Sequence, residues 1–221
     1  MTDLKIIFNR LAIAYGPLHW WPAETPFEVA IGAILTQNTN WKNVEMAIAN
    51  LRGEIALTPE ALAELPREKL EQLIYPSGFF RQKAERLQLL VEHLQNRHGN
   101  RLENLLSQSL DDARRELLQL KGIGPETADS ILLYAGELPS FVVDAYTNRL
   151  FGRLGVLQGN ESYEQVRALF MTQLPTDPVL FNEYHALIVQ HCKCFCRKRP
   201  VCAECCLNQD CRYAQGSLDS I

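Results

Sequence analysis

The cysteines of this 221-residue chain are confined to its C-terminal part. All seven lie at or after position 192, whereas structural disulfides would be spread along the chain. The residues Cys202, Cys205 and Cys211 follow the pattern C-x2-C-x5-C. Four thiolates at such spacings hold either an iron–sulfur cluster or structural zinc. The pattern therefore predicts a metal centre in a protein that works in a reducing compartment.

A second pattern, Leu120-Lys-Gly-Ile-Gly-Pro-Glu-Thr-Ala128, is typical of a tight turn between two helices. Gly122 and Gly124 can adopt positive φ and let another backbone approach, while Ile123 can pack inward. Pro125 suits the first position of the second helix, where the free N–H groups and the helix dipole attract a phosphate. The pattern predicts a helix–hairpin–helix that holds DNA without reading its sequence. An ordinary turn between helices is the alternative.

Asp144 follows an apolar run about 20 residues after this hairpin and precedes an expected helix. A carboxylate in this place can cap the helix, and it can also be a catalytic group. The hairpin, the Val-Asp pair and a helix with Arg149 and Arg153 together resemble the endonuclease III superfamily of DNA glycosylases. In that family the aspartate is catalytic. The resemblance therefore implies that Asp144 is the catalytic carboxylate, and the capping role is compatible with it.

Glu126 occupies the position where the bifunctional members of that superfamily carry a lysine. The amine of that lysine attacks the sugar, forms a Schiff base and permits strand cleavage. A glutamate cannot form this imine, and Lys121 lies before the first glycine rather than at the matching position. The resemblance thus implies a monofunctional glycosylase in which water is the nucleophile. A simpler reading of Glu126 is a carboxylate that favours a helix N-terminus.

The cysteine tail resembles the 4Fe–4S ligand set of the same superfamily. Cys202, Cys205 and Cys211 match its last three ligands, but the usual first spacing would place a ligand on Phe195. We expect Cys196 to be the first ligand, because it keeps the basic, proline-containing loop that the cluster encloses. Cys194 stays an alternative for this ligand, and zinc stays an alternative for the metal.

Three stretches further resemble the 3-methyladenine DNA glycosylase III branch of the superfamily. They are HWWPAETPFEVAIGAILTQNTNW, YPSGFFRQKAERL and LKGIGPETADSILLY, with the glutamate in place of the lysine. The cysteine tail departs from the best-known member of that branch. The resemblance implies an enzyme that releases alkylated purines such as 3-methyladenine. Glycosylases for oxidised pyrimidines or mismatched uracil and thymine, and a non-catalytic DNA-binding iron–sulfur module, are the alternatives.

The tryptophans are all found within a short part of the chain. Trp20, Trp21 and Trp41 offer flat walls for a flipped base, and Pro22 would hold their loop rigid. An N3-alkylated adenine is cationic, so aromatic faces attract it by roughly 0.5–2 kcal/mol. Core packing is the alternative role of these rings. Gln37 matches the family position that inserts into the duplex in place of the extruded base, with a buried helix end as the alternative.

The overall charge does not by itself favour a nucleic acid. The formal net charge is −4 and the pI is about 5.8. However, five basic residues face two acidic ones between positions 193 and 212. Because screening limits a distant charge to about 8–10 Å, this local excess leaves DNA binding open. No signal segment or membrane-length apolar run is evident, so we expect a soluble intracellular monomer whose partner is duplex DNA with a damaged base.

The periodicity of apolar residues predicts an all-α fold without strand pairs or repeats. By resemblance we expect two lobes: a six-helix barrel of residues 27–138 that contains the hairpin (about 113–135), and a second domain of residues 1–26 plus 139–221 that holds the cluster (196–211). The expected helices cover about 3–15, 27–37, 38–52, 66–74, 109–120, 125–134, 145–154, 162–174 and 178–191, with a short helix that begins at Pro59 and an amphipathic helix that follows the turn at 76–78 and is ended by Gly99.

Overall fold

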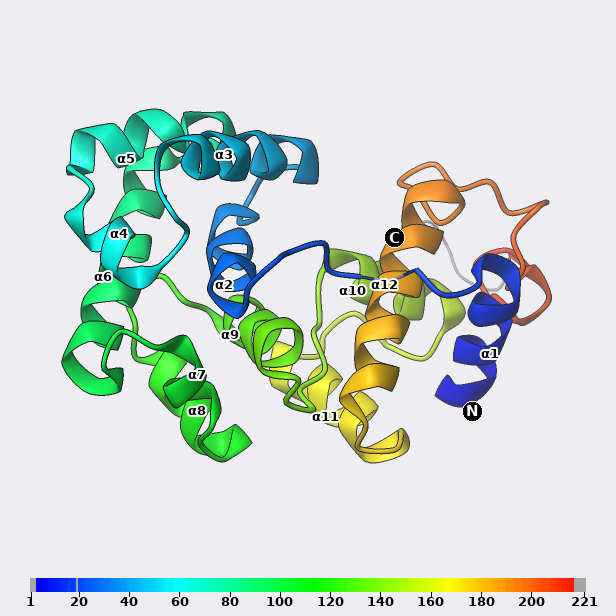
Figure 1. Cartoon of the computed structure of the whole chain (residues 1–221). Helices are drawn as coiled ribbons and strands as arrows, with labels where there is room; N and C mark the ends of the chain where they lie inside the picture. Colours follow the sequence, from blue (N-terminus) through cyan, green and yellow to red (C-terminus); the bar gives the residue numbers. More distant parts are fainter. Residues whose placement is uncertain (1–2, 19, 217–221) are drawn as a thin grey trace. The chain divides into compact units, whose positions relative to one another are not determined.

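The computed structural model describes residues 3–18 and 20–216 of the chain (Figure 1). Its described residues form helices, turns and loops, with no strand among them, which confirms the all-α prediction. The chain divides into two compact units. We call Trp21–Leu138 the central unit, and the described residues of the segments 1–20 and 139–221 the terminal unit. The expected boundary at 26/27 thus falls at 20/21 in the structure.

The central unit is organised around one helix that is buried on nearly every side. This helix, α2 (Pro26–Leu35), is apolar except for Glu28, which pairs with Arg52, and nine of its ten residues are buried. A helix of this composition needs neighbours on all faces. Its neighbours are the π-helical turn η2 (Ile131–Ala135) and several other helices of the same unit (Figure 1). The remaining elements of the unit are α3 (Trp41–Glu54), α4 (Pro59–Glu64), α5 (Arg67–Leu73), η1 (Tyr75–Ser77), α6 (Phe80–His98), α7 (Leu102–Leu106), α8 (Leu110–Leu118) and α9 (Pro125–Ser130).

The terminal unit joins the two ends of the chain. Its elements are α1 (Leu4–Tyr15), α10 (Ala145–Leu154), α11 (Tyr163–Gln173), α12 (Pro178–Cys194) and the short turn η3 (Asn208–Asp210). Helix α12 packs against both α1 and α10 (Figure 1). The hydroxyl of Tyr184 on α12 donates a hydrogen bond of 2.8 Å to the carbonyl of Leu4, and the rings of Phe141 and Phe170 stack at 4.0 Å. These buried contacts fasten α12 to α1 and the segment before α10 to α11.

The helix ends follow the local chemistry of their sequences. The hydroxyl of Thr58 caps α4 by accepting a hydrogen bond from the N–H of Ala61. Gly99 ends α6 in the left-handed region at φ 58°. Ser109 is the N-cap of α8, and its hydroxyl accepts a hydrogen bond from the N–H of Asp112.

Three elements differ from the helices expected from the sequence. The five-residue helix α7 was not expected, because so short a segment carries no helical period. The expected helix 125–134 changes after Ser130 into the π-helical turn. Helix α12 runs three residues beyond 191, so that Cys192 and Cys194 belong to the helix rather than to the loop.

Candidate active site and cysteine-lined cavity

Asp144 is the N-cap of α10, and its backbone is extended at φ −123° and ψ −176°. Its carboxylate oxygen Oδ1 accepts hydrogen bonds from the Thr147 backbone N–H at 2.7 Å and from the Thr147 hydroxyl at 2.9 Å. The Thr147 hydroxyl also accepts a long contact of 3.5 Å from the Asp144 N–H, which completes a capping box. The buried run Phe141–Val143 fixes the chain just before this residue. The carboxylate is therefore held in one orientation.

The second oxygen of this carboxylate faces a histidine from α12. The distance from His185 Nε2 to Asp144 Oδ2 is 3.5 Å, and both side chains are about nine-tenths buried. Burial raises the pKa of Asp144, but His185 and the two Thr147 donors outweigh it and hold that pKa below its ordinary value. Asp144 is thus an oriented anion at neutral pH, sheltered from bulk water. Such a group stabilises positive charge close to it more strongly than an exposed carboxylate would.

The hairpin between α8 and α9 has the expected shape in part. Gly122 adopts φ 86°, and Ile123 is buried in the core of the central unit. Gly124 was expected to share the positive φ, but it lies at φ −90° and ψ 176° because it is the N-cap of α9. No atom beyond its chain neighbours lies within 4 Å of where a Cβ would stand on Gly124. The hairpin is therefore open beside Gly124, whereas the Arg86 side chain lies against Gly122.

Gln37, which follows α2, contacts this hairpin through its side-chain amide. Its Nε2 donates to the carbonyl of Gly122 at 3.1 Å and to the hydroxyl of Thr127 at 2.8 Å. Its Oε1 accepts a hydrogen bond from Arg86 of α6. The neighbouring Asn38 is in the left-handed region at φ 54°. The loop that carries Gln37 is thus fastened to the hairpin by a side chain whose contacts all lie within the central unit.

The tryptophans separate into two groups. Trp21 and Trp41 meet edge to face at 4.8 Å, and Tyr134 of the π-helical turn lies 5.0 Å from Trp21. Gly32 of α2 lets the Trp21 ring pack closely, because a Cβ there would stand 3.2 Å from it. Trp20 belongs to the terminal unit, where the ammonium of Lys193 lies 5.5 Å from its ring centroid. The structure thus brings two of the three predicted rings together and adds a tyrosine.

The other side chains of the predicted substrate site lie at the surface of the central unit. Pro22 and Glu126 are exposed, and Glu126 lies in the first turn of α9. Two lysines of this unit have defined partners. Lys121 binds the carboxylate of Glu85 at 2.7 Å, and the buried Lys83 donates to two backbone carbonyls at 2.7 and 2.9 Å. Both amines therefore have partners within the central unit.

Four of the seven cysteines line a single apolar cavity in the terminal unit. They are Cys196, Cys202, Cys205 and Cys211, the four predicted ligands. Cys194 does not line the cavity, because it is the last residue of α12 and is exposed. Thiolates bind iron and zinc, so the four thiols that line this cavity supply the donor chemistry of a soft metal. The thiol set therefore fits the metal centre that the sequence predicts.

The charges around the cavity favour a thiolate at its first cysteine. The pKa of Cys196 is lowered to about 6, first by a hydrogen bond from Cys192 and also by Arg153, against the effect of burial. Burial raises the pKa of Cys205 to about 11. Burial also lowers the pKa of His191, which lines the cavity, to about 4, so this imidazole is neutral. A bound cation would lower the pKa of all four thiols.

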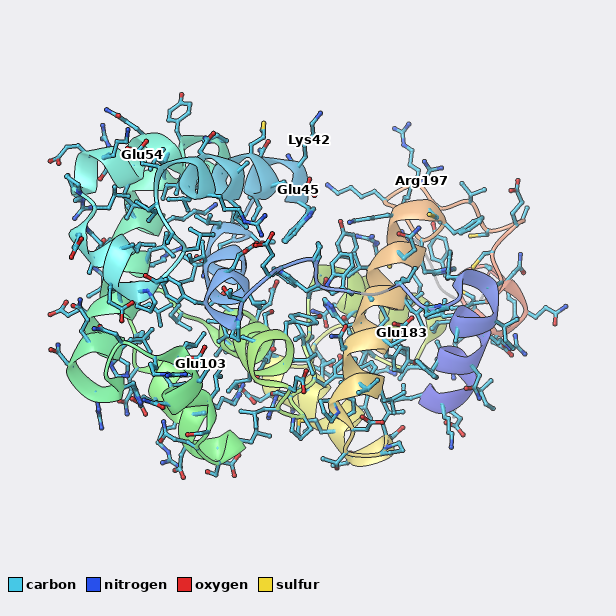
Figure 2. All side chains as sticks on the ribbon, viewed as in Figure 1. Lys42, Glu45, Glu54, Glu103, Glu183 and Arg197 are labelled. Atoms are coloured by element: carbon cyan, nitrogen blue, oxygen red, sulfur yellow. The ribbon has the colours of Figure 1, made fainter. Side chains whose placement is uncertain are left out.

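Arg153 of α10 connects the helix of Asp144 to the cysteine tail. Its guanidinium donates to the carbonyls of Arg197 and Lys198 at 2.7 and 3.1 Å and to the sulfur of Cys196 at 3.4 Å. The Tyr213 ring lies 4.8 Å from it. The side chain of Arg197 itself extends outward from the loop after α12 (Figure 2). The tail is thus braced on α10, while its basic side chains face solvent.

A family model describes most of this arrangement. The HhH-GPD superfamily model of base excision DNA repair proteins matches residues 31–176, which include the hairpin and Asp144. The chain belongs to this superfamily. It is therefore a helix–hairpin–helix DNA glycosylase of base excision repair, as its resemblance to the endonuclease III superfamily predicts.

Relatives of the HhH-GPD superfamily cover nearly the whole chain. A protein of Methanocaldococcus jannaschii that carries the name DNA repair glycosylase is 47% identical over 93% of this chain and 94% of its own. An endonuclease III of Thermotoga maritima is 33% identical over 85% of this chain and 83% of its own. Both alignments cover more of the chain than the family model, which matches residues 31–176.

Solved structures of HhH-GPD-like proteins show the same fold. An H. pylori 3-methyladenine DNA glycosylase bound to 1,N6-ethenoadenine matches with a TM-score of 0.75 and 29% identity, covering 87% of this chain and 98% of that one. An endonuclease III–DNA complex matches with a TM-score of 0.85 and 24% identity, covering 98% of each chain.

Across the ranges 3–18 and 20–216, no helix is both long and apolar enough to cross a bilayer.

The sequence does not predict several contacts of this HhH-GPD site. His185 lies 41 positions after Asp144, and nothing in its local sequence distinguishes it from a core histidine. Arg86 and Thr127 hold Gln37 from two different helices. For Arg153 a signal existed, because it is an arginine on the buried face of an amphipathic helix, where an arginine needs acceptors.

Proposed function

We propose that the chain is a monofunctional DNA glycosylase that hydrolyses the N-glycosidic bond of alkylated purines, chiefly 3-methyladenine. The observation that carries this proposal is the oriented, ionised carboxylate of Asp144 combined with a glutamate at position 126. As the bond between C1′ and the base breaks, its electron pair leaves with the base and neutralises the positive charge of the alkylated ring. Asp144 stabilises the oxocarbenium-like sugar, and water then adds to C1′ and loses a proton.

The side chains near the hairpin support the proposed absence of a lyase amine. Glu126 has no amine, Lys121 is paired with Glu85, and Lys83 is buried on two carbonyls. A Schiff base requires an amine that reaches C1′. The product is then an intact strand with an abasic site, and the strand breaks only when alkali is added.

The aromatic group supports a cationic base as the substrate. Trp21, Trp41 and Tyr134 present ring edges and faces to one another, and Glu126 contributes a negative charge in the same unit. An alkylated purine already has a good leaving group, so the site needs stacking and charge rather than a strong acid. The H. pylori relative, a 3-methyladenine glycosylase bound to ethenoadenine, supports the same substrate class. Pro22, next to Trp21, completes the proposed substrate group of the central unit.

The hairpin and Gln37 form the proposed DNA contact. Gly122, Ile123 and Gly124 shape the turn, which is open beside Gly124, and a phosphate would meet the N–H groups at the start of α9. Gln37 would enter the duplex in place of the extruded base. To do so it would exchange its hydrogen bonds with the hairpin for contacts to DNA. Insertion of Gln37 into DNA would therefore break the hydrogen bonds that fasten its loop to the hairpin.

The cavity of the terminal unit is the proposed site of a 4Fe–4S cluster, held by Cys196, Cys202, Cys205 and Cys211. The exposure of Cys194 and the inward position of Cys196 support this ligand set. The cluster would order the tail against α10, and Arg153 with the neighbouring N–H groups would offset its negative charge. Structural zinc is the alternative metal. Iron and sulfide analysis with a visible absorption spectrum distinguishes them, because a zinc protein is colourless.

A panel of duplexes tests the substrate class. Each duplex carries 3-methyladenine, an oxidised pyrimidine or a mismatched thymine, and base release is measured under single-turnover conditions. The proposal predicts the highest rate for 3-methyladenine. The 33% identical endonuclease III favours the second candidate, a glycosylase for oxidised pyrimidines, which predicts the opposite order. If no duplex loses a base while DNA is still bound, a non-catalytic DNA-binding module is the better description.

A further inference from the structure

Two histidines and a glutamate converge in the central unit, on helices that the proposed reaction does not use. His93 and His98 come from α6, and Glu116 comes from α8. The Nε2 atoms of the two imidazoles lie 2.5 and 2.6 Å from the same carboxylate oxygen, Oε1 of Glu116. Their side chains are only 14, 10 and 11% exposed. The three groups thus form a compact, largely buried cluster.

The carboxylate of this cluster is oriented by a further partner. Gln108 donates its side-chain amide to the other oxygen of Glu116, Oε2, at 2.8 Å. This bond leaves Oε1 directed at the two imidazoles. Support of this kind from a neighbouring amide is what fixes carboxylate ligands in metal sites. A solvent-open hollow lies beside the cluster and is lined by Gln108, Glu116 and Gln119 among others.

We propose that His93, His98 and Glu116 bind a divalent transition-metal cation of the zinc class. Imidazole nitrogen and carboxylate oxygen are ordinary ligands of Zn²⁺, at about 2.0–2.1 Å. The three ligand atoms lie within 4.8 Å of one another, and a tetrahedral ion would separate each pair by about 3.3 Å. The cation would therefore take the place of the hydrogens between the two Nε2 atoms and Oε1 after a shift of under about 1 Å; each imidazole would keep one proton, on Nδ1, and any further proton would pass to water. Water from the adjacent hollow would fill the fourth position.

The local charges permit a cation in this place. Arg97 Nε lies 3.7 Å from Glu116 Oε1, but its side chain is 61% exposed and can turn into water. Arg115, which also lines the hollow, is already paired with Asp112 at 2.7 Å. A cation that displaces Arg97 exchanges a weak, screened contact for direct coordination. Oxygen-seeking ions such as Mg²⁺ gain less, because two of the three ligands are nitrogens.

The consequence of binding would be structural. Glu116 lies on α8, which is the first helix of the hairpin, and both histidines lie near the end of α6. A metal would fasten α8 to α6 and so stiffen the helix that supports the hairpin. The site belongs to the central unit, whereas the seven cysteines belong to the terminal unit. It therefore differs from the proposed cluster in both ligands and location.

Zinc titration of the purified protein tests this site. The protein is dialysed against EDTA, the metal retained by its cysteines is measured, and Zn²⁺ is added in a calorimeter. Wild type should bind one further equivalent, and Mg²⁺ should give no such signal. His98→Gln and Glu116→Gln should lose this equivalent while retaining the cysteine-bound metal. Arg97→Gln is the matched control, because it keeps all three ligands and should bind zinc at least as tightly.

Thermal unfolding gives a second reading that is independent of calorimetry and of glycosylase activity. At free zinc about a hundredfold above the dissociation constant, the midpoint of wild type should rise by roughly 5–10 °C. The midpoint of Glu116→Gln, which is nearly isosteric with the native residue, should stay unchanged. Equal zinc isotherms for wild type and the two ligand variants would overturn the proposal, as would a wild type that takes up no zinc. Neither result would bear on base release.

Discussion

Arg153 should be one of the most costly residues to replace outside the proposed catalytic group. Replacing it with methionine keeps the length of the side chain and removes the guanidinium. The change deletes donors to the carbonyls of Arg197 and Lys198 and to the sulfur of Cys196. It also deletes a cation–π contact with Tyr213. Methionine can restore only the apolar packing.

The size of this effect follows from the contacts. Two charge-assisted hydrogen bonds to carbonyls contribute about 1.5–3 kcal/mol each, and methionine packing recovers part of that loss. We therefore expect Arg153→Met to lower the free energy of unfolding by roughly 3–5 kcal/mol, a large share of the 5–15 kcal/mol typical of a domain. Because the same bonds hold the loop at Cys196, the variant should also contain less tail metal.

Urea unfolding followed by circular dichroism, together with metal analysis of the folded protein, measures both effects. Arg197→Met is the matched control, since its side chain is exposed and its carbonyl remains as the acceptor. The control should change stability by no more than about 0.5 kcal/mol. If Arg153→Met matched wild type in both stability and metal content, the bracing of the tail by α10 would be refuted.

Three further outcomes are expected. Burial and Arg86 lower the pKa of Lys83 to about 8. Between about pH 8 and 10.5 the folded chain then binds fewer protons than the unfolded chain, so wild type should gain stability relative to Lys83→Met as the pH rises. Parallel urea titrations measure this, and a stability difference that does not change with pH would contradict it. Gly122→Ala should lower the free energy of unfolding by about 1–2 kcal/mol, because residue 122 adopts φ 86° and a Cβ there would displace Arg86. Thermal melts should show lower stability and DNA titrations weaker binding. If stability and DNA affinity were both unchanged, position 122 would not require glycine. Glu126→Lys should yield a borohydride-trapped DNA adduct that wild type does not form, measured on a denaturing gel, and trapping by wild type would overturn the proposed role of Glu126.

Local signals made most of the fold predictable. Helix ends such as Thr58 and Gly99 carry their own chemistry in one or two residues, so their positions follow from the sequence. The expected helix 145–154 matches α10 because Asp144 and Gly155 mark both of its ends. The π-helical turn after Ser130 has no such marker and was missed.

The site was predictable only where one residue type carries the chemistry. The spacing of the cysteines led to the four that line one cavity, and Asp144 stood out by its position after the hairpin. The partners of these groups come from distant segments, as His185 does for Asp144, and their sequence spacing has no fixed value. The separation of Trp20 from Trp21 depends on where the units divide, which adjacent residues do not signal.

Base release and strand cleavage on one methylated duplex, measured for wild type beside Asp144→Asn, test the central claim most directly. Asparagine caps a helix as well as aspartate does, so the variant keeps α10 and loses only the charge. We expect wild type to release 3-methyladenine, with nicks that appear only after alkali, and we expect the variant to bind the duplex without releasing the base. Nicks without alkali, or equal release by the variant, would contradict a hydrolytic glycosylase that depends on Asp144.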